Sequence, residues 1–147
     1  MKRLALLAAA VSLALASQSD LDSIKSEPKL ERRAEKALDN AFDALKSAQE
    51  SYLVKGDMAQ TGSDLDELSQ SVELAYTSLV DTGKNPSKSP KHFKRAEIKT
   101  RELLRRLNDF REQMSVDDRP AADKAHAVIQ KVHEDLLEGI MGGKKKR

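Results

Sequence analysis

The stretch KHFKRAEIKTRELLRRLNDFREQM, residues 91–114, decides the fold class. Apolar or small side chains recur in it at alternating spacings of three and four, a pattern that puts them on one face of an α-helix. This stripe consists of Phe93, Ala96, Thr100, Leu103, Leu107, Phe110 and Met114. Most other positions are charged, so the stretch predicts an amphipathic helix that buries one face against other helices. Ser89 as N-cap and Pro90 as first helical residue favour a start at about residue 90.

Three other stretches repeat this pattern, at about 29–55, 63–82 and 118–140. Gly56 and Gly83 stand where the first two should end, because glycine is favoured just beyond a helix C-terminus. Ser63, and Asp117 or Asp118, are the predicted N-caps of the second and the last helix. The stripe of the first helix is mostly alanine, which lets a neighbouring helix approach closely. Its members are Leu30, Ala34, Ala37, Ala41, Ala44 or Leu45, Ala48 and Tyr52.

Four such helices, two of their three joins being short, predict an all-α, antiparallel up-down-up-down four-helix bundle over residues 29–141. A three-helix core with one loosely packed helix is the alternative. The composition agrees, because 34% of residues are charged and only 3% are aromatic, as in coiled-coil-like proteins. We expect residues 17–28 to be a disordered leader and residues 142–147 to be a flexible basic tail.

The first sixteen residues have the three parts of a secretory signal peptide. Lys2 and Arg3 precede an apolar run from Leu4 to Leu15, and Ala14 and Ala16 supply the small residues of a cleavage site. We expect cleavage after Ala16 and export to the periplasm or the extracellular space. A buried N-terminal helix and an uncleaved anchor are the alternatives, although the run is shorter than the roughly 20 residues that span a bilayer. No later stretch is apolar enough to span one.

Cleavage of the signal peptide would change the net charge of the protein, and net charge is one basis for inferring its partner. The whole chain has 26 bases and 24 acids, and removing the two bases of residues 1–16 leaves 24 of each. The basic pI therefore gives no reason to expect specific nucleic-acid binding. The charge is instead polarised, with 14 acids and 7 bases in residues 17–82 but 10 acids and 17 bases in residues 83–147.

This polarised charge has two interpretations. The acidic half could lie beside the basic half and select the helix pairing, with Glu97–Arg101 and Glu102–Arg106 as i,i+4 pairs. Alternatively, the bases could form a surface for an anionic partner. The candidate residues for that surface are Lys91, Lys94, Arg95, Arg101, Arg105, Lys144, Lys145, Lys146 and Arg147.

The sequence has no arrangement of residues that is typical of a catalytic or metal-binding site. It contains no cysteine, which excludes disulfides and thiolate metal sites. His126 and His133 share a face of the last predicted helix but are about 10 Å apart along it, so they need a third element to hold one metal ion. The architecture is similar to that of the periplasmic b-type cytochromes, which use a methionine of the first helix and a histidine of the last. The first predicted helix here has no methionine, and Met58 follows it.

We therefore expect a non-enzymatic, secreted or periplasmic helical binding protein with no cofactor. Its partner is expected to be a protein or an anionic polymer or lipid of the cell envelope. The alternative is a small bundle that holds a metal ion or haem through His126 or His133.

Overall fold

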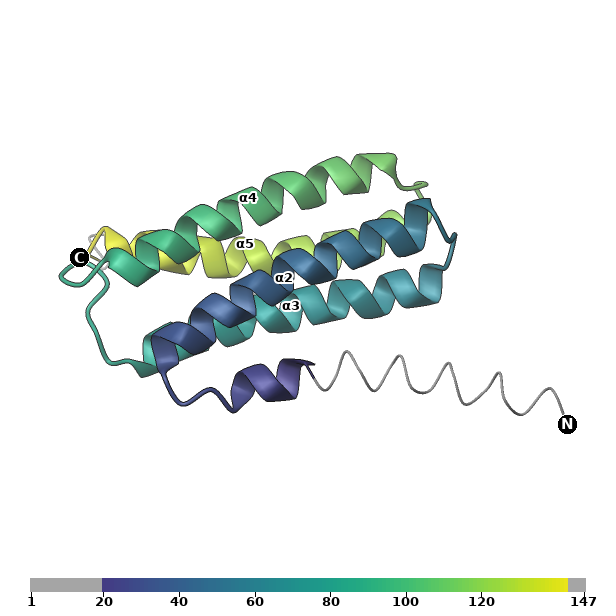
Figure 1. Cartoon of the computed structure of the whole chain (residues 1–147). Coiled ribbons are helices and arrows are strands. Elements are labelled where there is room, and N and C mark those ends of the chain that lie inside the picture. The colour runs from purple at the N-terminus through teal and green to yellow at the C-terminus, as the bar shows by residue number, and fades with distance from the viewer. Residues whose placement is uncertain (1–19, 143–147) are drawn as a thin grey trace, which may run out of the picture.

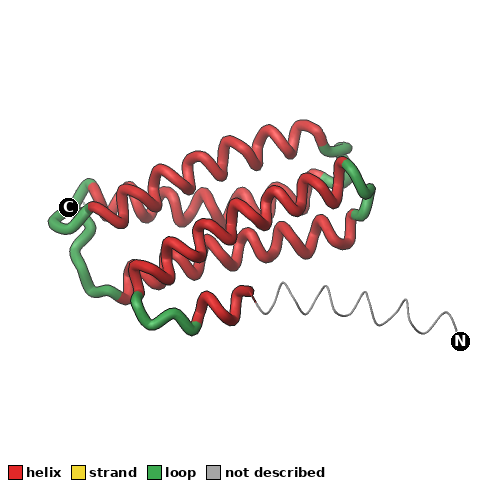
Figure 2. Tube along the Cα trace, in the orientation of Figure 1, coloured by secondary structure: helices red, strands yellow, loops and turns green. Residues whose placement is uncertain are grey.

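The computed structural model describes residues 20–142, so the predicted signal peptide and the bases 144–147 lie outside the described residues. Four long helices are packed side by side (Figure 1): α2 (Leu30–Leu53), α3 (Met58–Asp81), α4 (Lys91–Gln113) and α5 (Arg119–Ile140). Within residues 20–142 the remaining segments are loops, turns and one short helix, without a strand (Figure 2). The prediction of an all-α bundle is confirmed.

The four helices form two antiparallel hairpins. Residues 54–57 join α2 to α3, and residues 114–118 join α4 to α5 at the same end of the bundle. Across the two hairpins α2 packs against α4, and α3 packs against α5. The members of each of these two pairs run in the same direction (Figure 1). The chain runs up and down as predicted, but segment 82–90 crosses the bundle diagonally, so half of the neighbouring pairs are parallel.

The segment before α2 differs from the prediction of a disordered leader. Residues 20–25 are helical, which gives five helical segments within residues 20–142 instead of four. Leu21 is only 2% exposed, and Ile24 packs against the hydrophobic core. These two side chains are three residues apart and share one face of the helix, so burying them stabilises it. Pro28 follows the helix and cannot extend it.

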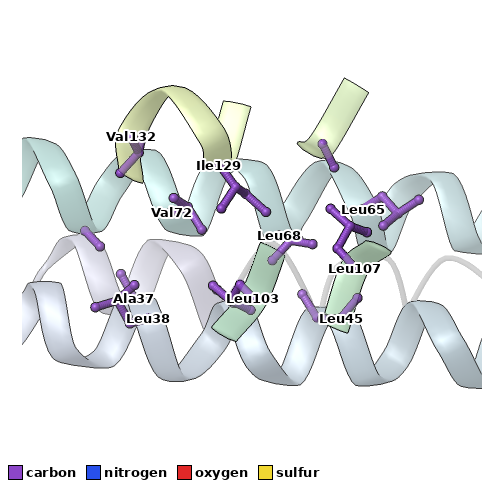
Figure 3. Close-up of a cluster of buried hydrophobic side chains, with 14 of the residues drawn as sticks. Ala37, Leu38, Leu45, Leu65, Leu68, Val72, Leu103, Leu107, Ile129 and Val132 are labelled. Atoms are coloured by element: carbon purple, nitrogen blue, oxygen red, sulfur yellow. The ribbon is translucent and has the colours of Figure 1, made fainter. Parts of the chain in front are cut away.

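The α2–α3 hairpin is the most closely packed pair of the bundle. Small residues make this approach feasible, because α2 contributes mainly alanines to the interface, as its sequence stripe predicts. The buried residues of α2 are Ala34, Ala37, Leu38, Ala41, Ala44, Leu45, Ala48 and Ser51. Larger side chains from all four helices fill the centre of the bundle, where Figure 3 shows Leu45, Leu65, Leu103, Leu107 and Ile129.

Helix α3 begins five residues earlier than expected. Asp57 is its N-cap, and its carboxylate accepts a hydrogen bond of 3.0 Å from the backbone N–H of Gln60. Ser63, the predicted N-cap, therefore lies inside the helix. The cap of α4 also differs, since Pro90 occupies the N-cap position in place of Ser89. The other helix boundaries agree with the prediction within two residues.

No helix in residues 20–142 is long and apolar enough to cross a membrane.

Candidate functional site

Bases of segment 82–90 and of α4 form ion pairs with acids of α2. Lys84 lies 2.7 Å from Glu31 and Lys99 lies 3.2 Å from Asp39, measured between nitrogen and carboxylate oxygen. Arg95 pairs with Glu35 between these two contacts. The three acids are four residues apart on α2, and the paired bases follow the same order because α2 and α4 are parallel. These pairs match the expectation that the acidic half lies beside the basic half.

Arginines further along α4 are neutralised within the helix itself. Arg101 lies 3.1 Å from Glu97, and Arg105 lies 2.6 Å from Glu102. Arg105 and Arg106 both donate hydrogen bonds to the Glu102 carboxylate, and these bonds lower its pKa to about 2. Exposed pairs of this kind stabilise a fold by about 0.2–1 kcal/mol each. Among the candidates for an anionic partner, Arg95, Arg101 and Arg105 thus have acidic partners.

The lysines near the start of α4 have a different environment. Residues 83–95 contain five bases and no acid. Lys84 and Arg95 are paired with α2, whereas Lys88, Lys91 and Lys94 are exposed and have no ion-pair partner among the residues that the structure describes. These three lysines therefore keep their positive charge at the surface.

The local sequence holds these lysines at one end of the bundle. The Asn85 carboxamide oxygen accepts a hydrogen bond of 2.9 Å from the Ser87 N–H, and the Asn85 carbonyl accepts one of 2.8 Å from the Ser89 N–H. This turn places Lys88 just before the first turn of α4. The last turn of α5 packs on the same loop, because a Cβ added to Gly139 would lie 3.1 Å from Cγ of Pro86. Gly142, the last described residue, therefore lies at this end of the bundle.

A surface pocket of about 330 Å³ lies beside these lysines, between the N-termini of α2 and α4. It is lined by Lys29, Glu31, Arg32, Glu35 and His92. The His92 Nδ1 atom is buried and has no hydrogen-bond partner within residues 20–142. Since the lining mixes three nitrogen bases with two carboxylates, its charge selects neither anions nor cations.

The two histidines proposed as metal or haem ligands lie in separate environments. His133 is 9% exposed, and its Nδ1 lies 3.1 Å from the hydroxyl of Thr100. That hydroxyl is also 2.9 Å from the Ala96 carbonyl, so when it donates its proton there, Nδ1 of His133 must be the donor. The His133 Nε2 atom faces Glu97 at 3.9 Å. His126 is half-buried two turns earlier, near Asp123.

The structure does not bring these histidines together with a third ligand. Within residues 20–142 no group of three or more His, Asp or Glu side chains is arranged to hold a metal ion. His133 instead joins α4 to α5 through its contacts with Thr100 and Glu97.

A buried carboxylate, that of Asp64, was not identified from the sequence. Asp64 is 3% exposed between α2 and α3. Its carboxylate accepts hydrogen bonds from Ser47 at 3.1 Å, Ser51 at 3.0 Å and Gln60 at 3.0 Å. The available signal was the pair of serines four residues apart beside the alanine stripe of α2. Both carboxylate oxygens are satisfied, so this group stabilises the interface.

Glu67 lies one turn further along α3 and is affected by the same cluster. Partial burial raises its pKa, and the nearby carboxylates of Asp64 and Asp20 raise it further, while a hydrogen bond from Asn40 opposes them.

Comparison with known proteins gives no further assignment, because no family model, no characterised protein and no solved structure matches this chain.

Proposed function

We propose that this chain is an exported, non-enzymatic binding protein that attaches to an anionic component of the cell envelope. The observation that supports this function is the set of exposed lysines at one end of the bundle, Lys88, Lys91 and Lys94, which have no acidic partner within residues 20–142. We define this region, residues 83–94, as the basic end.

The proposal divides the described anion-binding candidates into two groups. Lys91 and Lys94 belong to the basic end. The tail residues Lys144, Lys145, Lys146 and Arg147 lie outside the described residues and stay candidates from the sequence alone. Arg95, Arg101 and Arg105 are neutralised by neighbouring carboxylates, and we assign to them the pairing of helices and the stabilisation of α4. An anion would have to compete with those carboxylates for the arginines, whereas the lysines have no described acid to displace.

The expected strength of attachment follows from the number of bases. A lysine near an anionic surface contributes about 1 kcal/mol, and salt weakens this attraction because the Debye length falls from about 10 Å at 0.1 M to about 3 Å at 1 M. Replacing Lys88, Lys91 and Lys94 with glutamine should therefore cost about 3 kcal/mol of binding free energy, which corresponds to about a 100-fold loss of affinity.

A matched variant distinguishes this region from a general effect of charge. Lys46, Lys55 and Lys124 are also exposed and have no ion-pair partner among the described residues, but they lie away from the basic end. Binding of polyphosphate, as a soluble polyanion, would be measured for the triple variants K88Q/K91Q/K94Q and K46Q/K55Q/K124Q. The first should lose most of its affinity with an unchanged Tm, and the second should lose little. Equal losses would show that the basic end has no special role.

A further inference from the structure

We propose that the basic end binds an anionic lipid bilayer, and that an apolar patch beside it enters the interfacial region of the lipid. This inference rests on the proposed function and specifies its partner. Three large apolar side chains on α4 and at the C-terminal end of α5 are exposed close to the lysines: Ile98 is 56% exposed, Leu137 is 36% exposed and Met141, the C-cap of α5, is 61% exposed.

The helix period places Ile98 among bases. Lys91, Lys94, Ile98, Arg101 and Arg105 follow one another at spacings of three and four on α4, which puts them on one outward face. Lys91 and Lys94 lie between Ile98 and the start of α4. Arg101 and Arg105, which pair with carboxylates, lie beyond Ile98 towards the C-terminus of the helix. Ile98 is therefore adjacent to the part of this face that keeps its positive charge.

The contact between Glu97 and His133 fixes how α5 lies along this face. The two helices are antiparallel, and Nε2 of His133 lies 3.9 Å from the Glu97 carboxylate. Leu137 and Met141 follow His133 by one and two turns, towards the basic end. They are therefore level with the first turns of α4, where Lys91 and Lys94 are located. We call Lys91, Lys94, Ile98, Leu137 and Met141 the end face.

A bilayer fits this combination better than a soluble polyanion does. A hydrated polymer offers negative charge but no apolar phase, so exposed Ile, Leu and Met side chains would gain nothing from it. An anionic membrane presents negative headgroups directly above a hydrocarbon region, and peripheral proteins bind it through bases and apolar side chains on one surface. An acidic protein is the other partner of matching chemistry, and the experiment below tests it as an alternative.

The experiment compares binding to lipid with binding to a soluble polyanion. The chain would begin at Ser17, because the apolar stretch 4–15 would itself bind lipid and the described fold lies entirely within residues 20–142. The end-face variant is I98S/L137S/M141S. The matched control is L53S/V54S/V116S, since these three apolar residues are 51%, 78% and 73% exposed near the opposite end of the bundle. Circular dichroism and Tm verify that both variants are folded.

Affinity is measured by co-sedimentation with vesicles of equal parts phosphatidylglycerol and phosphatidylcholine, and separately for polyphosphate. The end-face variant should bind these vesicles at least tenfold more weakly than the parent and bind polyphosphate equally well, because burial of apolar surface contributes only to lipid binding. The control variant should match the parent in both assays.

A fluorescent probe gives an independent measurement, because the chain has no tryptophan. In M141W, emission should shift to shorter wavelength when the anionic vesicles are added, and in L53W it should not.

The outcomes separate the two proposals. If the end-face variant binds vesicles as the parent does, or loses vesicle and polyphosphate binding equally, the lipid proposal is wrong while the basic end can still bind anions. If the parent binds polyphosphate but not the vesicles, or binds an acidic polypeptide such as polyglutamate in preference to them, the lipid proposal is also wrong. If the parent binds neither vesicles nor polyphosphate, both proposals fail.

Discussion

Truncation of Leu107 to alanine measures how much the centre of the bundle contributes to stability. Leu107 is fully buried, and Figure 3 shows it in the same core cluster as Leu45 of α2 and Leu65 of α3. The substitution removes three carbon atoms, which at about 0.8 kcal/mol each is a transfer loss of about 2.4 kcal/mol. The cavity adds to this loss to the extent that the helices cannot move together. We expect Leu107→Ala to lower the free energy of unfolding by about 3 kcal/mol.

Urea denaturation followed by circular dichroism measures this loss directly. For a domain of this size the same change should lower Tm by about 10–15 °C. Two controls test the position of the side chain. Leu107→Met keeps the volume and should cost less than about 1.5 kcal/mol, and Arg105→Ala, on the exposed face, should cost less than about 0.5 kcal/mol. Equal losses for Leu107→Ala and Arg105→Ala would refute the assignment of the buried face of α4.

Three further predictions concern the buried carboxylate, a titrating glutamate and the N-terminus. Asp64→Ala should lower the free energy of unfolding by about 1–3 kcal/mol because Ser47, Ser51 and Gln60 lose their acceptor, whereas Asp64→Asn, which keeps one oxygen, should cost less in the same urea titration. The folded state raises the pKa of Glu67 above its ordinary value of 4.5, so the ionised side chain destabilises the fold as pH rises above about 4.5. Glu67→Gln should therefore raise Tm at pH 7 but not at pH 4, and Glu73→Gln, on the exposed face of α3, should do neither. Mass spectrometry of the exported protein should find Ser17 at the N-terminus, and an intact Met1 on protein recovered from the cytoplasm would contradict the predicted export.

The helices were predictable from sequence because each has a regular apolar stripe bounded by turn residues. The buried residues of α4 are the stripe that its sequence predicts, from Phe93 to Phe110. The start of α3 was not predictable in the same way. Asp57 and Ser63 are both good N-caps. A start at Asp57 includes Thr61 in the helix, and Thr61 is fully buried in the structure.

The short helix before α2 was missed for a similar reason. Leu21 and Ile24 are only two apolar residues in a polar segment, and nothing in the sequence indicates that a surface is available to bury them.

The candidate site was predictable in part. The excess of bases near α4 is visible in sequence, but which of them have acidic partners depends on the parallel arrangement of α2 and α4, which follows from a diagonal connection rather than from any local pattern.

That diagonal connection also bears on whether two copies of the chain could exchange hairpins. Neighbouring helices lie about 8–10 Å apart, so opposite corners of the bundle are separated by roughly 14 Å. The nine residues 82–90 can reach about 30 Å when extended, which is twice the required span. Because the connection closes without strain, and domain swapping is favoured by hinges too short to close, the second hairpin should fold back onto the first within the same molecule. The length of this loop thus favours a monomer over a domain-swapped dimer.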